Sequence, residues 1–540
     1  MSGLLSIREL SVRLPRGADR SHALVDVSLD LAPNEILCLV GESGSGKSLT
    51  AAAVMGLLPG PQVFAEKGAI LFEGRDLLRL SEAEMRAIRG ARIGMIFQEP
   101  MTALNPVIPV GRQIEEVLEE HTAMTRAERV RRVLALLEEV RIPDPASAAR
   151  AHPHELSGGQ RQRAMIAMAL ALNPRLLIAD EPTTALDVTT QKHILGLIRE
   201  LQRSHGTGVL FITHDFGVVA EIADRVAVMQ HGRVVEQGAA EQVLNRPSHP
   251  YTRALIAAVP TLAHSPRGRD FPCAPVLAVR NLSKTYRPAG LFARRRTVHA
   301  VKDVSFDLHR GETLGIVGES GSGKSTVARC LVRLLDPDGG SMVVDGLDMA
   351  ALSRARLRRE ARRVQMVFQD PFASLNPRRT AGDLVAQGPM LHGVPREEAQ
   401  ARAAELFRLV CALPAAMSRL PHEFSGGQRQ RIGLARALAM RPTVLVADEP
   451  VSALDVSVQA QVLRLLRDLR DRLRLSIVFI THDLRVAAEL CDRIAVMHEG
   501  EIVEHGPTAE VFAAPRHDYT RTLMDSIPGR TWTPPALEPA

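Results

Sequence analysis

The sequence is poor in aromatic residues and cysteine, and it contains no long hydrophobic run. Phe, Trp and Tyr make up 3% of its 540 residues, whereas apolar residues make up 45%, so we expect aliphatic, Ala-rich cores. The longest uninterrupted apolar run, residues 164–172, is about half the length needed to span a bilayer. Residues 1–10 lack the charged-then-apolar pattern of a signal peptide. We therefore expect any membrane role to require partner subunits.

The cysteines and the net charge exclude several classes of protein. The five cysteines are far apart and form neither a CxxC pair nor a metal-ligand spacing, which favours a reducing, cytoplasmic compartment. They are Cys38, Cys273, Cys330, Cys411 and Cys491. Cys38 falls within an apolar strand-like run and is predicted to be a small buried hydrophobe. The net charge of +6 is too small for a dedicated nucleic-acid binder, so we expect no nucleic-acid partner.

What the sequence does contain is an internal repeat. The eight residues Gly41–Ser48 recur letter for letter as Gly318–Ser325, and four further motifs follow each copy in the same order. A chain of this length comfortably holds two domains, and the nearly constant spacing of the motifs indicates one fold repeated. The predicted organisation is a first domain over 1–260, a linker over 261–275, a second domain over 276–528 and a tail over 529–540.

Within each half, short apolar strands alternate with helical segments. In the first half we expect buried strands over 35–40, 176–179 and 209–212, a helix over 48–58, and a hairpin over 225–236. Uninterrupted apolar strands of this length are typical of parallel sheets covered on both faces. The pattern predicts an α/β fold, with a doubly wound core in each half.

The repeated string has the form G-x-x-x-x-G-K-S, which is a phosphate-binding P-loop. Its glycines let successive backbone N–H groups turn toward phosphate oxygens, and the following helix adds its positive N-terminal end. Lys47 and Lys324 can reach the β- and γ-phosphates, and the hydroxyls of Ser48 and Ser325 suit Mg²⁺. The predicted ATP-binding residues are Gly41, Glu42, Ser43, Gly44, Ser45, Gly46, Lys47 and Ser48, with Gly318, Glu319, Ser320, Gly321, Ser322, Gly323, Lys324 and Ser325.

Each half also carries two adjacent carboxylates at the end of an apolar run. These are Asp180-Glu181 and Asp448-Glu449, each followed by Pro. Functional sites of α/β sheets lie at the carboxyl ends of the strands. The aspartates are placed to hold Mg²⁺ and its water, and the glutamates to polarise an attacking water. Alone such a pair is more often a solvated turn, but downstream of a P-loop in both halves the catalytic interpretation is favoured.

A Ser-Gly-Gly-Gln string lies between the P-loop and the paired carboxylates in both halves, and it is the most diagnostic motif. It comprises Ser157, Gly158, Gly159 and Gln160 in the first half and Ser425, Gly426, Gly427 and Gln428 in the second. Read alone it is an ordinary helix N-cap or an anion site at a helix N-terminus. With the preceding motifs, nearly the whole chain resembles a tandem ATP-binding cassette ATPase. The resemblance implies, in each half, a RecA-like α/β core, an antiparallel β subdomain and a helical subdomain.

The resemblance also implies roles for further residues. Ser425 would contact the terminal phosphate held by Lys47 beside Glu181. Ser157 would contact the terminal phosphate held by Lys324 beside Glu449. Gln98 and Gln369 look like the Q-loop residues that touch Mg²⁺ and couple to transport. His214 and His482 resemble the switch histidines, and Asp187 and Asp455 the D-loop aspartates. The implied metal ligands are Ser48, Gln98, Asp180, Ser325, Gln369 and Asp448.

One position departs from the family pattern. Members of the family usually stack an aromatic side chain on adenine, and Tyr286 fits that role in the second half. Leu14 occupies the corresponding position in the first half. Because stacking of a base on an aromatic ring contributes about 1–3 kcal/mol, we expect weaker nucleotide binding at the first P-loop.

Two segments point to a subgroup of the family. Residues 247–260 look like the C-terminal element of peptide and nickel importer ATPases, and residues 516–523 are a looser copy in which Asp518 replaces Pro. The resemblance implies an ATP-hydrolysing subunit for import of di- or oligopeptides or glutathione, peripheral on the cytoplasmic face of the membrane. Its partners would be two membrane permeases and, indirectly, a periplasmic binding protein. Some relatives hold an iron–sulfur cluster after this element; only Cys273 lies nearby, so we expect none here.

Other classes fit less well. An exporter ATPase shares the same motifs, and nickel or sugar importers are related alternatives. A tandem ATPase acting on ribosomes would need a long charged linker, and a DNA-repair cassette would need zinc-binding cysteines. The substrate, the direction of transport and the oligomeric state stay open at this point.

Overall fold

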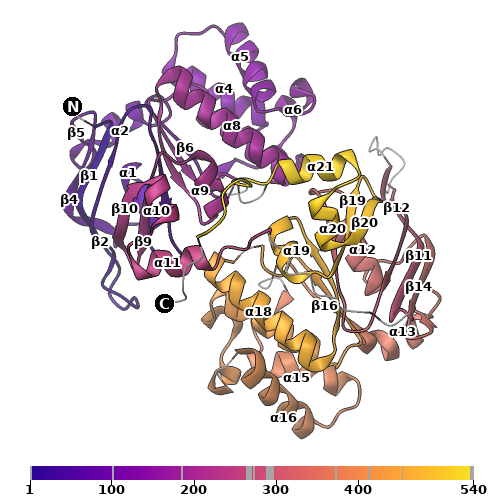
Figure 1. Cartoon of the computed structure of the whole chain (residues 1–540). Coiled ribbons are helices and arrows are strands. Elements are labelled where there is room, and N and C mark those ends of the chain that lie inside the picture. Colours follow the sequence, from indigo (N-terminus) through magenta and orange to yellow (C-terminus); the bar gives the residue numbers. More distant parts are fainter. Residues whose placement is uncertain are drawn as a thin grey trace. The chain divides into compact units, whose positions relative to one another are not determined.

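We describe a computed structural model of the chain, shown in Figure 1. It describes residues 3–99, 103–183, 186–262, 271, 274–287, 297–370, 374–411, 414–452 and 454–535. Contacts divide the chain into two compact units. The first unit contains residues 1–259 and 526–540, and the second contains residues 260–525. Each unit is described by itself.

The core of the first unit is a six-stranded sheet in the order β10-β9-β3-β8-β7-β6. Its strands are β3 (Ile36–Val40), β6 (Ile93–Ile96), β7 (Leu176–Asp180), β8 (Gly208–Ile212), β9 (Arg225–Gln230) and β10 (Arg233–Ala239). All neighbours pair in parallel except β9 and β10, which form an antiparallel hairpin. Every residue of β3, β7 and β8 is buried, as expected for a sheet covered on both faces.

A second, antiparallel sheet packs with this core. Its strands are β1 (Leu5–Arg13), β2 (His22–Leu31), β4 (Phe64–Phe72) and β5 (Arg75–Asp76), in the order β2-β1-β4-β5. Side chains from β1, β2 and β4 share one hydrophobic cluster with those of β3, β7 and β8. The helices around the two sheets are α1 (Lys47–Val54), α2 (Glu82–Ile88), α8 (Val188–His205), α9 (Phe216–Ile222), α10 (Ala240–Asn245) and α11 (Pro250–Ala257).

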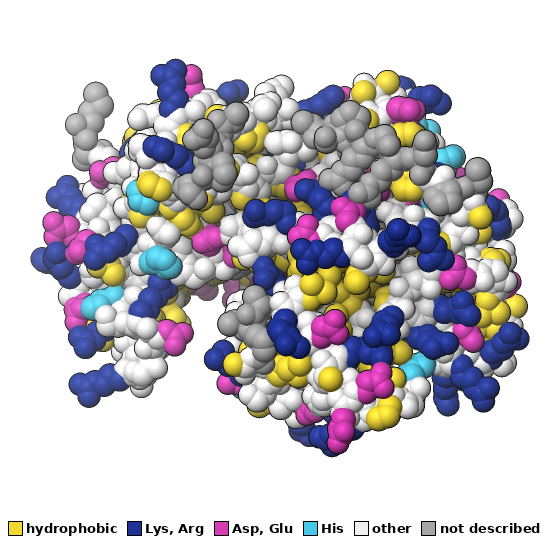
Figure 2. All heavy atoms as spheres, turned by 60° about the horizontal axis from the view of Figure 1, so that its bottom comes forward, with side chains coloured by type: hydrophobic (Ala, Val, Ile, Leu, Met, Phe, Trp, Pro, Cys, Tyr) yellow, Lys and Arg dark blue, Asp and Glu magenta, His cyan; other side chains and the backbone are white. Residues whose placement is uncertain are grey.

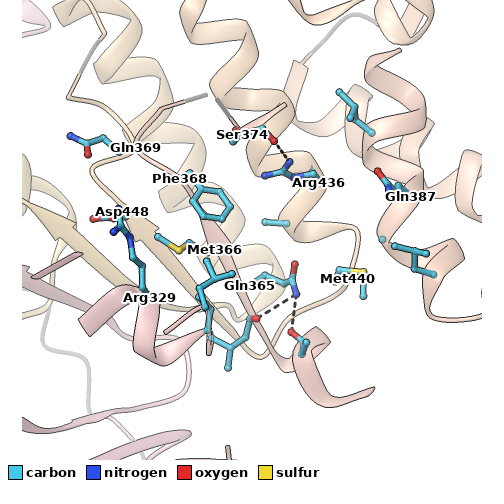
Figure 3. Close-up of a pocket in the computed structure, with 18 of the residues that line it drawn as sticks. Arg329, Gln365, Met366, Phe368, Gln369, Ser374, Gln387, Arg436, Met440 and Asp448 are labelled. Atoms are coloured by element: carbon cyan, nitrogen blue, oxygen red, sulfur yellow. Dashed lines mark hydrogen bonds between the residues drawn. The ribbon is translucent and has the colours of Figure 1, made fainter. Parts of the chain in front are cut away.

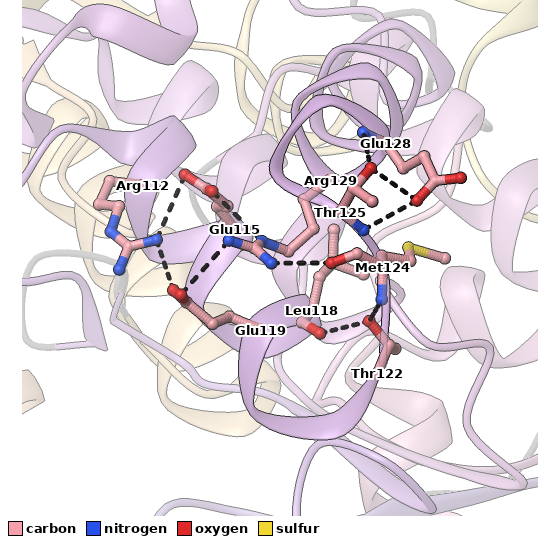
Figure 4. A network of polar contacts seen from close by, with 9 residues as sticks. All are labelled: Arg112, Glu115, Leu118, Glu119, Thr122, Met124, Thr125, Glu128 and Arg129. Carbon is pink, nitrogen blue, oxygen red and sulfur yellow. Dashed lines mark hydrogen bonds and ion pairs between the residues drawn. The ribbon is translucent and has the colours of Figure 1, made fainter.

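In the described residues between β6 and β7, α-helices pack on one another as a helical subdomain. They are α4 (Val110–His121), α5 (Arg126–Glu139), α6 (Pro145–Arg150) and α7 (Gly158–Ala169). Ion pairs join α4 to the start of α5, including one from Arg129 to Glu115 at 3.3 Å (Figure 4). At the start of α5, Thr125 and Glu128 form a reciprocal capping box, which satisfies two of the otherwise unpaired backbone donors.

The second unit repeats this architecture. Its six-stranded sheet contains β13 (Thr313–Val317), β16 (Val364–Val367), β17 (Val444–Asp448), β18 (Ser476–Thr481), β19 (Arg493–His498) and β20 (Glu501–Pro507), and its antiparallel sheet β11 (Leu277–Tyr286), β12 (Val298–Leu308), β14 (Gly339–Val344) and β15 (Leu347–Asp348). Its helices are α12 (Lys324–Leu331), α13 (Arg354–Glu360), α15 (Ala381–Leu391), α16 (Arg396–Leu406), α17 (Gly426–Leu438), α18 (Val456–Leu473), α19 (Leu484–Leu490), α20 (Thr508–Ala513) and α21 (Asp518–Asp525). The predicted tandem α/β fold, with its antiparallel and helical subdomains, is confirmed.

The local predictions agree with the structure apart from their limits. The predicted strands over 176–179 and 209–212 are β7 and β8, the predicted hairpin is β9–β10, and the helix expected over 48–58 spans Lys47–Val54. Cys38 is fully buried in β3, as expected. Within the described part of the chain, no helix combines the length and apolar character needed to cross a membrane. On the face shown in Figure 2, Lys and Arg side chains are interspersed with Asp and Glu.

The segment that follows α21 packs against the first unit. Residues 526–529 are buried, with Ile527 only 7% exposed. The backbone N–H of Gly529 donates to a carboxylate oxygen of Glu221 on α9 at 3.1 Å. The indole N–H of Trp532 donates to the side-chain oxygen of Asn245 on α10 at 3.0 Å. The chain thus returns to its first unit after completing the second. The domain limits predicted from the sequence stay predictions.

Candidate functional site

Each P-loop joins a buried strand to the N-terminus of a helix. In the first unit the loop connects β3 to α1, and Gly41 adopts a φ of +151°. A Cβ atom at Gly41 would lie 2.3 Å from the carbonyl oxygen of Met229 on β9, so only glycine fits there. The ammonium of Lys47 donates to the carbonyl oxygens of Gly41 and Glu42, at 2.7 and 2.9 Å. The lysine is therefore held over the loop, where phosphates would bind.

The second P-loop, between β13 and α12, has the same geometry. Gly318 has a φ of +153°, and a Cβ atom there would lie 2.2 Å from the carbonyl oxygen of Met497. The ammonium of Lys324 donates to the carbonyl oxygens of Gly318 and Glu319, at 2.8 and 2.6 Å. The two units therefore present equivalent phosphate cradles.

The predicted metal-binding carboxylates lie beside the P-loop serines. The hydroxyl of Ser48 donates to a carboxylate oxygen of Asp180 at 3.0 Å, and that of Ser325 donates to Asp448 at 3.1 Å. Burial raises the pKa of Asp180 to about 6, and burial also raises the pKa of Asp448. A buried carboxylate beside a hydroxyl supplies hard oxygen ligands of the kind that Mg²⁺ prefers.

The predicted catalytic glutamate of the first unit lies between its predicted partners. One carboxylate oxygen of Glu181 accepts from the side-chain amide of Gln98 at 3.2 Å, and the other lies 3.3 Å from the Nδ1 atom of His214. Glu181 follows β7 with a φ of +47°, a left-handed conformation that is uncommon for residues other than glycine. Such strain is typical of functional sites, and here it turns the glutamate away from the strand direction.

The same constellation recurs in the second unit. The amide of Gln369 donates to Glu449 at 2.8 Å, Nδ1 of His482 lies 3.2 Å from the other carboxylate oxygen, and Glu449 has a φ of +46°. Burial by itself would raise the pKa of Glu449, but the hydrogen bond and charge of His482 outweigh it and lower the pKa. Burial would lower the pKa of His482, but Glu449 raises it overall. Both effects favour an ionised glutamate facing a protonated histidine.

The Ser-Gly-Gly-Gln motifs begin α7 and α17. Ser157 and Ser425 are the N-cap residues, and each accepts a hydrogen bond from the backbone N–H of the glutamine three residues later, at 3.3 and 3.4 Å. Both serines are exposed. The N-cap interpretation is therefore correct locally, and it leaves the motif at the surface. The predicted reach of each motif to the nucleotide of the other unit stays a prediction.

The predicted D-loop aspartates are also helix N-caps. Asp187 precedes α8 and accepts from the backbone N–H of Thr190 at 2.8 Å. Asp455 occupies the N-cap position of α18. Their predicted role at an interface between the two units stays a prediction.

The predicted adenine-binding regions of the two units differ at two residue positions. Tyr286 ends β11, is 40% exposed, and has its hydroxyl 3.5 Å from that of Thr326 on α12. In the first unit Leu14 and Leu49 occupy these two positions, and both pack against the hydrophobic core. The first unit therefore offers an apolar surface where the second offers an aromatic ring and a hydroxyl.

A pocket of about 740 Å³ in the second unit includes two of the predicted metal ligands in its lining (Figure 3). Gln369 and Asp448 line one part of it, and residues of α15 line another. Among the lining residues, Leu334 and Leu391 are 59% and 78% exposed. Arg436, another lining residue, donates from its side chain to the carbonyl oxygen of Ser374. The pocket thus joins the predicted Q-loop to an exposed apolar rim.

Sequence reasoning missed several contacts to the P-loops. The hydroxyls of Tyr251 and Tyr519 bond to the backbone N–H groups of Glu42 and Glu319. The guanidinium of Arg20 donates to the carbonyl oxygen of Gly44 at 2.7 Å. The signal that could have revealed the tyrosines is their rarity, because the chain contains only three. Arg20 lies between β1 and β2, and nothing in its local sequence marks it.

The remaining predictions concern metals. Among the described residues, no group of three or more His, Cys, Asp or Glu side chains is arranged to hold a metal ion. Cys273, on which the expectation about an iron–sulfur cluster depends, lies outside the described residues.

Comparison with protein families and with curated proteins agrees with this geometry. The "ABC transporter" family model matches residues 24–184 and 301–452, and the model "Oligopeptide/dipeptide transporter, C-terminal region" matches residues 235–277 and 503–533. The chain is 48% identical to the glutathione import ATP-binding protein GsiA of Escherichia coli O157:H7, over 97% of this chain and 89% of that protein. It is 49% identical to the peptidoglycan transport ATP-binding protein YejF of Agrobacterium fabrum, over 96% of both chains.

Solved structures of single cassettes are also similar to part of the chain. One is the ATP-binding cassette MJ0796 in a dimeric, post-hydrolysis state with ADP and Pi, with 30% identity and a TM-score of 0.39 over 43% of this chain and 98% of that one. Another is CbiO1 from Clostridium perfringens, with 28% identity and a TM-score of 0.40 over 44% of this chain and 91% of that one.

Proposed function

Because the chain belongs to the ABC transporter family of ATP-binding cassette ATPases, we propose that it energises an importer for small peptide-like substrates, including glutathione. Two findings support the proposal. Relatives similar over nearly the whole chain are named as import or transport ATP-binding proteins, and both units match the oligopeptide/dipeptide transporter C-terminal region.

The observation that carries the proposed chemistry is the repeated Gln–Glu–His constellation. Glu181 and Glu449 are each held within 3.3 Å of a histidine nitrogen and a glutamine nitrogen. Each follows a strand that is separated from the P-loop strand by one intervening strand. This arrangement supports the glutamate as the group that accepts a proton from the attacking water. The histidine would exchange its bond to the glutamate for one to the terminal phosphate, which releases the carboxylate toward the water.

The residues that would hold the nucleotide and its metal follow from the same geometry. Lys47 would exchange its two carbonyl partners for phosphate oxygens, and Ser48, Asp180 and Gln98 would surround Mg²⁺, as would their counterparts in the second unit. The ion would neutralise phosphate charge. Burial raises the pKa of Asp180, and a nearby cation would favour its ionised form.

The exposed Ser-Gly-Gly motifs support pairing of the two units around ATP. A hydroxyl and backbone N–H groups at the N-terminus of a long helix suit a terminal phosphate. We propose that Ser425 contacts the nucleotide bound by Lys47, and that Ser157 contacts the one bound by Lys324. Because both units belong to one chain, each has its partner at high effective concentration.

The pocket beside Gln369 supports contact with a membrane subunit. Its rim carries Leu334 and Leu391, whose exposed side chains suit the apolar face of a short helix. A permease segment in this pocket would sense movement of Gln369 during the ATP cycle. We therefore propose two membrane permeases as partners, a binding protein outside the membrane, and a peripheral location on its cytoplasmic face.

The substrate class is proposed from the relatives. Glutathione and peptidoglycan fragments share short peptide backbones with unusual linkages, and the relatives named for them are equally similar to this chain. We propose a substrate of this chemical class. The choice of substrate within this class would be made by the permeases and the binding protein, because the sites assigned to the described residues bind nucleotide and not the transported substrate.

Removing the carboxylate charge in both units tests the catalytic role. The variant Glu181→Gln with Glu449→Gln keeps the shape of both side chains, so it should bind ATP with little change while hydrolysis falls at least about 100-fold. Binding of a fluorescent ATP analogue and release of phosphate are the two measurements. Near-normal hydrolysis by the double variant would refute the assignment of the glutamates.

Transport by the reconstituted complex tests the substrate class. Vesicles that contain the chain with its permeases would be assayed for ATP-dependent uptake of glutathione, dipeptides, longer peptides and soluble peptidoglycan fragments. Uptake of at least one of these, abolished by the double glutamine variant, is the expected result. ATP-dependent movement in the opposite direction would favour an exporter instead.

A further inference from the structure

All three tyrosines of this aromatic-poor chain lie at the predicted nucleotide sites. Tyr286 occupies the predicted adenine position of the second unit. Tyr251 lies on α11 and Tyr519 on α21, which are the last helices before the chain leaves each unit. These two helices belong to the C-terminal element, for which neither the motifs nor the proposed function supplies a role.

The hydroxyl of each of these two tyrosines bonds directly to a P-loop. The backbone N–H of Glu42 donates to the hydroxyl oxygen of Tyr251 at 3.2 Å, and that hydroxyl donates to a carboxylate oxygen of Glu42, also at 3.2 Å. In the second unit the backbone N–H of Glu319 donates to the hydroxyl oxygen of Tyr519 at 3.1 Å. Glu42 and Glu319 are the second residues of their P-loops, directly before the N–H groups that face phosphate.

A fixed framework holds Tyr251 in place. The carboxylate of Glu236 on β10 accepts from the backbone N–H of Ser248 at 2.7 Å and from that of His249 at 3.1 Å. The ring nitrogen Nδ1 of His249 then accepts the backbone N–H of Tyr251 at 3.2 Å, which caps α11. Pro250 begins the helix, where its fixed φ is favourable. The framework therefore aims the tyrosine before any nucleotide binds.

The second unit builds the same framework from a different sequence. Glu504 on β20 accepts from the backbone N–H groups of Arg516 and His517, at 2.8 and 3.1 Å, and Nδ1 of His517 accepts that of Tyr519 at 3.1 Å. Asp518 replaces the proline, yet the hydroxyl reaches the P-loop again. The tyrosine ring also packs on His498, with ring centroids 3.9 Å apart.

The P-loop of the first unit is thus held on two sides by one hairpin. Gly41 abuts the carbonyl oxygen of Met229 on β9, and Glu236 on β10 anchors the element that carries Tyr251. A loop whose N–H groups are already oriented binds phosphate without first losing conformational freedom. Loss of the hydroxyl leaves the Glu42 N–H without this protein partner and allows the loop more conformations.

We propose that Tyr251 and Tyr519 are positioning residues that set the nucleotide affinity of their own P-loops. The C-terminal element acts through them by holding the loop in its phosphate-binding shape. The inference rests on the proposed function, since it takes ATP as the ligand of both loops. It goes beyond that function by assigning the C-terminal element to control of nucleotide binding.

The test uses the full-length chain with one site at a time. Tyr251→Phe is introduced with Lys324→Ala, and Tyr519→Phe with Lys47→Ala, so that each measurement reports one site. The net contribution of one hydrogen bond predicts a rise of about 2- to 10-fold in the Kd and KM for ATP, with kcat at saturating ATP changed less than about 2-fold. Phenylalanine keeps the ring, so the melting temperature should stay at the parent value.

Ser204→Ala provides a matched control. Its exposed hydroxyl on α8 donates to the carbonyl oxygen of Glu200 at 2.7 Å and lies 2.8 Å from Nδ1 of His205, so the variant also loses the hydrogen bonds of a hydroxyl in the first unit. It should leave the Kd for ATP unchanged. A second variant, Ser248→Ala, weakens the anchor on Glu236 and should raise the Kd in the same direction as Tyr251→Phe, by a smaller factor.

Three results would overturn the inference. The first is an unchanged Kd in both tyrosine variants. The second is a fall in melting temperature with an unchanged Kd, which would make the contact structural only. The third is a fall in kcat with an unchanged Kd. If the parent single-site proteins bind no ATP, the proposed function itself fails, and that result is distinguishable because it precedes the tyrosine variants.

Discussion

The two nucleotide sites should differ in affinity because their adenine positions differ. The second unit presents Tyr286 beside Thr326, and the first presents Leu14 beside Leu49. Stacking of a base on an aromatic ring contributes about 1–3 kcal/mol. Tyr286 is 40% exposed, so a base would cover only the open part of the ring, and the lower end of that range applies. We expect the second site to bind ATP about 5- to 12-fold more tightly than the first, which corresponds to about 1–1.5 kcal/mol.

The assay isolates each site in the full-length chain. Lys47→Ala leaves the second site, Lys324→Ala leaves the first, and a fluorescent ATP analogue is titrated into each. Tyr286→Leu should then raise the Kd of the second site to that of the first. Tyr286→Phe is the control, because it keeps the ring and loses only a hydroxyl contact of 3.5 Å, and it should change the Kd less than about 2-fold.

The converse variant should improve the first site. Leu14 and Leu49 each pack against the core, and the double variant Leu14→Tyr with Leu49→Thr reproduces the pair found in the second unit. We expect the Kd of the first site to fall by a similar factor. Equal affinities of the two sites in the parent chain, or no effect of Tyr286→Leu, would refute the reasoning.

Three further predictions follow from the described contacts. Arg470→Ala breaks a fully buried ion pair to Asp492 of 3.2 Å, so it should destabilise the second unit by about 3–5 kcal/mol in urea unfolding. Glu236→Gln should cost the first unit about 1 kcal/mol well above pH 4.5. Burial alone would raise the pKa of Glu236, but hydrogen bonds from the C-terminal element lower it, so its contribution decreases as the pH falls from 4.5 through the lowered pKa. Each of Glu181→Gln and Glu449→Gln alone should lose at least about half of the ATPase rate, because both constellations are complete.

Each of these predictions has a result that would contradict it. At the position that corresponds to Arg470, the first unit has Gln202, which donates to the carbonyl oxygen of Asn34 at 2.7 Å; Gln202→Ala removes a neutral bond and should cost only about 1 kcal/mol. Equal costs would contradict the ion-pair argument. A Glu236→Gln difference in melting temperature that persisted below pH 4.5 would contradict the pKa argument. A silent Glu449→Gln would make the second site regulatory.

Much of the fold was predictable because its signals are local. Fully apolar runs such as 176–179 and 209–212 are strands because only a sheet covered on both faces buries such runs. The P-loops were predictable because eight consecutive residues make up the motif. Its glycines, such as Gly41, occupy positions where the backbone adopts a positive φ. The hairpin was predictable from its turn. The limits of the helix after the first P-loop were not predictable. Helix propensity does not identify the last residue of a helix, because that residue depends on packing.

The candidate site was predicted in composition but not in conformation. Motif spacing identified Glu181, Gln98 and His214, yet it did not indicate that the glutamate adopts a positive φ. Likewise, the capping bonds of Ser157 followed from its sequence, whereas its exposure depends on how α7 packs. Backbone strain of this kind is held by surrounding structure, so it cannot be inferred from the strained residue itself.

The sequence by itself determined the repeated chemistry: two P-loops, two paired carboxylates and two Ser-Gly-Gly helix starts, each encoded by adjacent residues. Only the tertiary structure decided which distant residues serve these motifs. Tyr251 reaches a loop 209 positions earlier, and Gly529 bonds to a residue 308 positions earlier. Such contacts depend on the geometry of all the strands, helices and turns between the two residues. They therefore cannot be predicted from any short stretch of sequence.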